Sequence, residues 1–167
     1  MYSLTSPLVH PFYIHFPIAI SFILPFLIGF LFYYERTNER KGIDNPSSGL
    51  WSLIFICIFI STIFTILALA SGSAAVDYFQ SKLAEQSTEM KAIQAHEEIA
   101  ELFGMVSYVL CGLSIFVFIY KGKRRKQLLY AIFGLALGQF AMALYAGKTG
   151  GAIIYTTGAA EYLMNAF

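Results

Sequence analysis

Histidine carries the most usable chemistry in this 167-residue sequence, and it occurs three times. His10 and His15 belong to the segment HPFYIHFP, in which each histidine is followed within two residues by a proline. His96 stands shortly before another apolar run. Imidazole binds zinc, copper, iron and nickel ions and serves as an axial ligand of haem. Because a histidine near a membrane span is costly, the three together favour a metal or haem site over simply solvated side chains.

The spacing of the first two histidines limits what they can do together. Two residues five apart on one regular helix point about 140° away from each other. We therefore expect only one of them to face inward, and we expect it to be His15, which is closer to the apolar run. His10 is then a secondary ligand or a neighbour of the ligands. Pro11 suits the first turn of a helix, whereas Pro17 is expected to bend the helix and set the angle at which His15 leaves it.

The composition shows where these residues must be held. The chain is 57% hydrophobic and only 13% charged, with a mean hydropathy of +0.65, whereas an average globular chain is about a quarter charged. This deficit of charge indicates an integral membrane protein. Cys57 and Cys111 both lie in apolar runs, and without a Cys-x-x-Cys pair they offer neither a zinc knuckle nor a covalent c-type haem attachment.

Four apolar segments are long enough to cross a membrane. They cover residues 16–34, 50–72, 100–120 and 128–147, and a spanning helix needs roughly 20 apolar residues. Backbone amides in lipid must be satisfied within the segment, so these segments are expected to be helices. The sequence therefore predicts one all-α domain over residues 1–167, an up-down four-helix transmembrane bundle. Thr88 is expected to cap the start of the third helix.

Basic residues predict the orientation of this bundle. Eight of the eleven lysines and arginines fall in the first and third connections, residues 35–49 and 121–127. Cytoplasmic loops carry such an excess, so both termini are expected on the outer, periplasmic side of a bacterial inner membrane. Topology alone accounts for these basic residues, and no nucleic-acid partner is expected.

An up-down bundle brings the candidate site residues to one end. The first and third helices both begin on the outer side, so His10, His15 and His96 are expected at one level. Asp77 follows the second apolar run, and Gly150 and Gly151 follow the fourth. We predict that His15 and His96 form a ligand pair and that Asp77 accepts an imidazole N–H. The small residues Gly134 and Gly138 are expected to let the fourth helix approach a neighbouring helix closely.

These residues also carry a resemblance. The sequence resembles a bacterial family of four-helix membrane proteins classed as a domain of unknown function. The matching positions are His10, Pro11, His15, Phe16, Pro17, Gly72, Asp77, His96, Gly150, Gly151, Tyr155 and Gly158. The resemblance covers most of the chain and implies the four-helix fold and the site. It also implies redox work, because some relatives are joined to cytochrome c-like modules.

Three functions remain open at this point. The first is a membrane-embedded b-type haem protein that passes electrons on the periplasmic side, with His15 and His96 as main ligands, His10 secondary, and Gly150, Gly151 and Tyr155 around the cofactor. The second is a bare iron, copper or zinc site built from His15, His96, His10 and Asp77, with Glu97 or Glu98. The third is a non-catalytic subunit of a larger respiratory membrane complex. A soluble cytochrome is an expected partner of the first or the third, docked by the acidic second connection.

Overall fold

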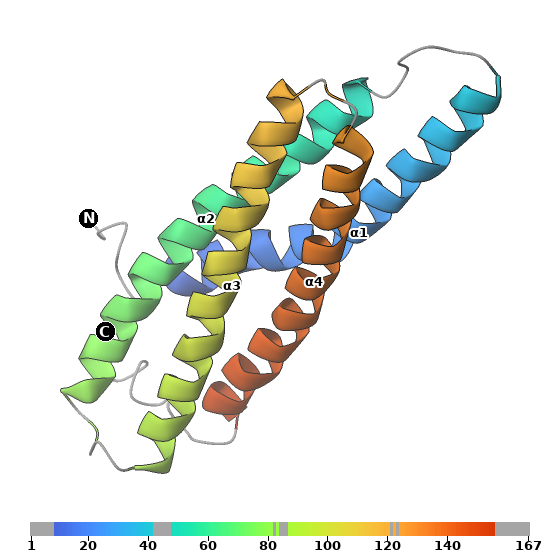
Figure 1. Ribbon diagram of the computed structural model, residues 1–167. Helices are drawn as coiled ribbons and strands as arrows, with labels where there is room; N and C mark the ends of the chain where they lie inside the picture. Colours follow the sequence, from blue (N-terminus) through green and yellow to red (C-terminus); the bar gives the residue numbers. More distant parts are fainter. Residues whose placement is uncertain are drawn as a thin grey trace.

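The computed structural model describes residues 9–41, 48–81, 83, 87–120, 122 and 124–155. Its described residues form four long helices (Figure 1). They are α1 (His10–Arg40), α2 (Ser48–Gln80), α3 (Thr88–Ile119) and α4 (Arg125–Tyr155). The main contacts join α1 to α2, α2 to α3, α3 to α4 and α4 back to α1. The predicted all-α four-helix architecture is confirmed.

Each helix is long and apolar enough to cross a membrane. The most apolar 18-residue stretch of each helix has a mean hydropathy of 2.2 in α1, 2.8 in α2, 2.3 in α3 and 1.7 in α4. The helices contain 31 to 33 residues, about 46–50 Å at 1.5 Å per residue. The hydrocarbon core is about 30 Å thick, so each helix continues roughly ten residues beyond it. The predicted segments were shorter because they ended near the first charged residues, which do not end a helix.

The start of α3 differs by one residue from the prediction. Ser87, not Thr88, is the N-cap, since the Ser87 side chain accepts a hydrogen bond of 3.1 Å from the backbone N–H of Met90. Thr88 is the first residue of the helix. Both side chains can cap a helix, and their neighbouring positions gave the sequence no means of choosing between them.

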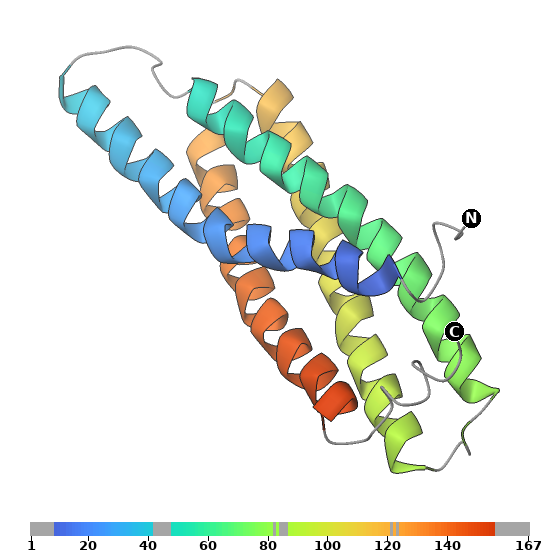
Figure 2. The same ribbon diagram turned by 180° about the vertical axis from the view of Figure 1, so that it is seen from behind.

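Helix α1 bends, and the bend decides where its histidines lie. Pro17 and Pro25 are both buried inside the helix. A proline inside a helix lacks the N–H for the usual bond and its ring clashes with the preceding turn, which produces a kink. Figure 2 shows the first half of α1 turning away from the line of its second half and crossing toward α2. The bend carries His10 to the α2 side of the bundle.

The two ends of the bundle differ in their side chains. We call the end where α1 and α3 finish the basic end, and the opposite end the histidine end. At the basic end Arg125 on α4 is 3.1 Å from the Glu35 carboxylate on α1, and Lys126 is 2.5 Å from Glu39. Such partly exposed pairs contribute about 0–1 kcal/mol each. They fix the pairing of α1 with α4 more than they stabilise the fold.

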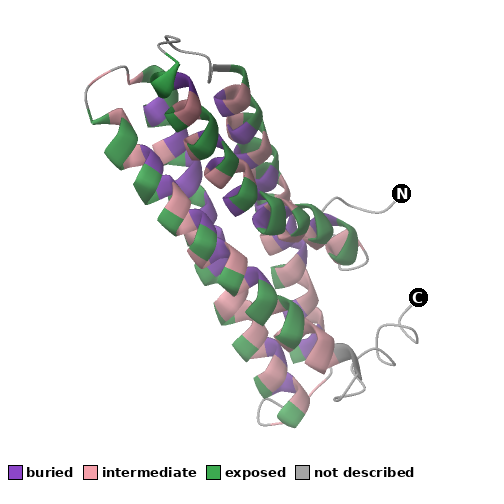
Figure 3. Ribbon diagram, turned by 90° about the vertical axis from the view of Figure 1, so that its right-hand side faces the viewer, coloured by how far each residue is buried: buried purple, intermediate pink, exposed green. Residues whose placement is uncertain are grey.

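The interior is mostly apolar, and within the described ranges one hydrogen bond joins buried side chains of two helices. The main cluster of buried residues comes from all four helices and includes Leu24, Ile54, Leu110 and Ile132. Further along the bundle the Gln139 side chain donates a 2.6 Å hydrogen bond to the Ser107 hydroxyl, and both residues are buried. Outward positions carry many exposed large hydrophobic side chains, and buried and exposed residues alternate along the helices (Figure 3). This is the pattern of a bundle whose outer surface faces lipid.

The predicted packing role of the α4 glycines is wrong. A Cβ atom added at Gly134 or Gly138 would have nothing within 4 Å, and Gly134 is exposed. The glycine spacing identifies a smooth helix face, but it does not say whether another helix covers that face. The buried residues of α4 that lie next to these glycines in the sequence are Ile132, Ala136 and Gln139.

Candidate histidine site

His10 is the first residue of α1, and its imidazole packs against α2. Its Nδ1 atom lies 2.9 Å from the carbonyl oxygen of Ala68 and 3.1 Å from the hydroxyl of Ser71. The ring lies so close to Gly72 that a Cβ atom there would be 3.1 Å from His10 Cε1. Glycine at this position is therefore what lets the imidazole lie against the α2 backbone.

His96 makes the same kind of contact between α3 and α4. Its Nδ1 atom lies 2.8 Å from the Thr149 hydroxyl. A Cβ atom at Gly150 would be 3.2 Å from His96 Cε1. Each histidine thus packs on a glycine of the following helix and bonds to the hydroxyl of the residue before that glycine.

The hydrogen-bond partners of Nδ1 define the tautomer of His10 and favour the same tautomer for His96. The Thr149 hydroxyl can donate its proton to the Ala146 carbonyl, 3.1 Å away, which leaves its oxygen to accept from His96. The Ser71 hydroxyl likewise donates to the Leu67 or Ala68 carbonyl, at 2.9 or 3.1 Å. A carbonyl oxygen only accepts, so in His10, which contacts the Ala68 carbonyl, Nδ1 carries the proton and Nε2 keeps its lone pair. We assign the same tautomer to His96, whose Nδ1 contacts a hydroxyl in the matching place. Within the described ranges neither Nε2 atom has a hydrogen-bond partner.

The two imidazoles lie at a similar height in the bundle. Gly72 stands roughly 36 Å along α2 from the basic end, and Gly150 roughly 38 Å along α4, at 1.5 Å per residue. One imidazole comes from the α1–α2 pair and the other from the α3–α4 pair. The histidines of the first and third helices thus lie toward the same end of the bundle, and their action as one ligand pair stays a prediction.

The choice of His15 as the inward histidine is wrong. His15 is exposed, and its Nδ1 hydrogen-bonds to the carbonyl of Pro11 in the same helix. The inward face of α1 carries His10, Tyr13 and Pro17, at the three- and four-residue spacing of one helix side. His15 is rotated away from that face, as the 140° separation requires. His10 therefore takes the place predicted for His15.

The predicted acidic ligands do not join the histidines. Asp77 and Glu98 are exposed and Glu97 is half-buried, and the two inward imidazoles bond through Nδ1 to Ala68, Ser71 and Thr149 rather than to Asp77. Among the described residues no three His, Cys, Asp or Glu side chains come together as a metal site would require. The predicted role of Asp77 as the hydrogen-bond acceptor is wrong.

Of the two glycines predicted around a cofactor, only one contacts an inward histidine. Gly150 contacts the imidazole of His96, whereas a Cβ atom at Gly151 would have nothing within 4 Å. Tyr155 ends α4, but its side chain lies outside the described residues, as does Gly158. A direct role of Gly151 and Tyr155 in cofactor binding stays a prediction.

Ser71 and Thr149 are the site residues that the sequence reading missed. Their signal was present as a repeated pattern, Ala-x-x-Ser/Thr-Gly, at 68–72 and 146–150. In both copies the hydroxyl is bonded to the alanine carbonyl three residues earlier. The pattern marks the two places where a helix receives a histidine.

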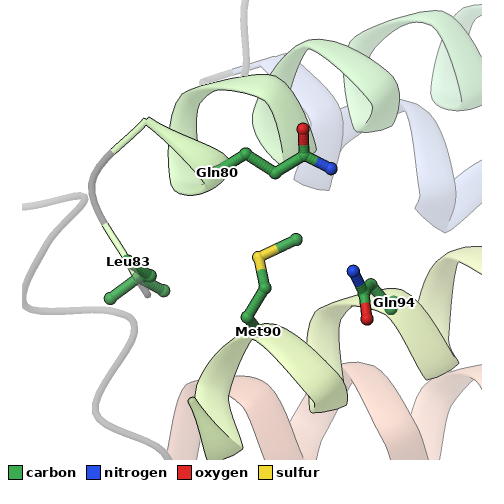
Figure 4. Close-up of a pocket in the computed structure, with 4 residues that line it drawn as sticks. All are labelled: Gln80, Leu83, Met90 and Gln94. Carbon is green, nitrogen blue, oxygen red and sulfur yellow. The ribbon is translucent and has the colours of Figure 1, made fainter. Parts of the chain in front are cut away.

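A separate small pocket lies between α2 and α3 at the histidine end. It has a volume of about 270 Å³ and is lined by Gln80, Leu83, Met90 and Gln94. Figure 4 shows the two glutamine amides on either side of the Met90 side chain. Typical ligand pockets measure about 300–1,000 Å³, and neither inward histidine lines this one. The candidate site is therefore the histidine pair rather than this pocket.

The helices define a multi-pass helical membrane protein with two inward imidazoles toward one end of the bundle. No family model matches the sequence, and no curated protein or solved structure shows detectable similarity to it. The particular activity must therefore be argued from the site.

Proposed function

We propose that the protein binds a b-type haem through His10 and His96 at the periplasmic end of the bundle and passes electrons there. The observation that carries this proposal is that both imidazoles bond through Nδ1 to the following helix, while neither Nε2 atom has a hydrogen-bond partner among the described residues. A ligating histidine typically donates its other ring N–H to a carbonyl or a similar acceptor, which fixes the tautomer and the ring orientation. Two histidines prepared in this way are a matched pair of ligands.

The number of ligands favours haem over a bare metal ion. A zinc site uses three or four protein ligands, and the described residues bring no such group together. Haem supplies four nitrogen donors of its own, so two axial imidazoles complete the iron coordination. The residues of this site fit that requirement. A bound haem would supply a one-electron couple, and the chain's own part is to hold the two imidazoles and keep their surroundings apolar.

The surroundings supply apolar and acidic groups suited to this function. Phe16 stacks on Phe64 with ring centroids 4.0 Å apart, and Phe12 lies edge-on to the same ring at 6.4 Å. These rings join the first half of α1 to α2 near His10 and add to the apolar character of that end. Asp77 and Glu89 belong to the acidic segment between the second and third apolar runs. We expect this segment to dock a basic soluble cytochrome in the periplasm of a bacterial inner membrane.

Absorption spectroscopy of the full chain tests the proposal directly. The protein is purified in detergent, supplied with haem, and compared with His10→Ala, His96→Ala and the matched control His15→Ala. The unmodified chain and His15→Ala should show a Soret band and sharp α and β bands on reduction, at one haem per chain. His10→Ala and His96→Ala should lose the low-spin spectrum, because each removes one axial ligand.

Two results would overturn the proposal. Absence of haem bands in the folded unmodified chain after haem addition would do so, and would favour the non-catalytic subunit. Full retention of the low-spin spectrum by both His10→Ala and His96→Ala would place the ligands elsewhere. Circular dichroism of each variant shows whether the helices are intact, so that loss of haem is not confused with loss of fold.

A further inference from the structure

The two halves of the histidine site repeat the same unit, but their imidazoles differ in the number of hydrogen-bond partners. In each, a hydroxyl lies one residue before a glycine, is bonded to the alanine carbonyl three residues earlier, and is within hydrogen-bond distance of an imidazole Nδ1. His10 has a second acceptor, because its Nδ1 also lies 2.9 Å from the Ala68 carbonyl. For His96 the Thr149 hydroxyl is the one acceptor among the described residues.

This difference makes the two hydroxyls unequal. Without the Ser71 hydroxyl, His10 would still donate Nδ1–H to the Ala68 carbonyl at its present position. Without the Thr149 hydroxyl, the His96 Nδ1–H would lose its acceptor, and the ring would be free to rotate or to exchange its proton to Nε2. A proton on Nε2 removes the lone pair that a metal ligand needs. The orientation and tautomer of His96 therefore depend on Thr149.

We infer that Thr149 is the positioning residue that holds His96 ready to coordinate haem iron. Ser71 is its counterpart at His10, but there the Ala68 carbonyl can replace the hydroxyl as the hydrogen-bond partner. The haem part of this inference rests on the proposed function, whereas the tautomer of His96 does not. Thr149 does not touch the ligand in this assignment; it acts through the imidazole. Loss of a hydrogen-bonding group of this kind typically weakens metal affinity about 10–100-fold.

The test compares Thr149→Val, which keeps the shape of the side chain, with Thr149→Ser and Ser71→Ala. The first measurement uses the haem-free protein, labelled with ¹⁵N in its histidines, at about pH 8.5, where an ordinary imidazole is neutral. Imidazole ¹⁵N shifts should report the Nδ1–H form for His10 and His96 in the unmodified chain. Thr149→Val should give His96 a mixture of both tautomers, while Thr149→Ser and Ser71→Ala keep the Nδ1–H form.

The second measurement is haem affinity by titration. Thr149→Val should raise the haem dissociation constant about 10–100-fold, and Ser71→Ala by less than about 10-fold. Thr149→Ser should restore the unmodified value. The inference is overturned if Thr149→Val leaves the His96 tautomer unchanged, or if it binds haem as tightly as Ser71→Ala. Failure of the unmodified chain to bind haem would refute the proposed function instead, and the ¹⁵N comparison would still decide the role of Thr149.

Discussion

Replacing Gly150 with alanine is a test of the contact on which the His96 half of the site depends. The added Cβ atom would stand 3.2 Å from His96 Cε1 and 3.7 Å from both ring nitrogens. Carbon atoms at their best separation are about 3.5–4.0 Å apart. The ring must therefore withdraw by a few tenths of an ångström, and it cannot do so without disturbing the 2.8 Å hydrogen bond to Thr149.

Gly151→Ala provides a matched control for the expected change in stability. A helix-interior glycine destabilises by about 1 kcal/mol relative to alanine, and a Cβ atom at Gly151 would have nothing within 4 Å. The control should therefore be as stable as the unmodified chain or more stable by about 1 kcal/mol. Gly150→Ala gains the same helix propensity, but adding a methyl group to a tight contact typically costs about 1–3 kcal/mol. We expect it to be less stable than Gly151→Ala by about that amount.

The assay is thermal unfolding in detergent, read together with the haem spectrum. For a chain of this size about 1 kcal/mol corresponds to about 2–4 °C in melting temperature. Gly150→Ala should melt below Gly151→Ala and should bind haem more weakly, because the displaced ring no longer holds its position. Equal melting temperatures and equal haem affinity for the two variants would refute the argued contact between His96 and the backbone of α4.

Two further predictions concern the bundle and its orientation. Ser107→Ala should lower the free energy of unfolding in detergent, because it leaves the buried Gln139 amide without its acceptor. The expected loss is about 0.6–1.7 kcal/mol, the range for a hydrogen bond between membrane helices. An unchanged free energy of unfolding would mean that water replaces the hydroxyl. A topology reporter fused at Lys123 should be active in the cytoplasm, whereas one fused at Gln86 should be active in the periplasm, and the reverse pattern would overturn the orientation inferred from the basic residues.

The number and type of helices were predictable because the physical constraint is severe. A run of about 20 apolar residues that crosses a bilayer forms a helix, because only a helix satisfies the hydrogen bonds of its backbone within the segment. The same reasoning could not place the helix ends, since beyond the hydrocarbon core nothing in a charged residue stops a helix. The second half of α1 thus continues through Glu35 and Glu39 to Arg40.

The inward histidine was not predictable from spacing. The 140° separation correctly required that His10 and His15 point in different directions. The rotation of α1 about its own axis, however, depends on which side chains fit against the neighbouring helices. Gly72 accepts an imidazole because it has no side chain, and it lies 62 positions further along the sequence. Proximity to the apolar run, on which the choice of His15 rested, carries no information about that rotation.

The site is better understood as a property of two helix pairs than of three histidines. In each pair the first helix supplies an imidazole, and the second supplies a glycine that makes room and a hydroxyl that fixes the tautomer. Neither pair alone offers more than one inward imidazole among the described residues, and the contacts of α1 with α4 and of α2 with α3 bring the two pairs together. The bend of α1, which contains Pro17 and Pro25, is what sets His10 against α2 and lets the first pair resemble the second. A ligand that needs two imidazoles would then be bound by the closed bundle and not by either pair, which couples its binding to the assembly of all four helices.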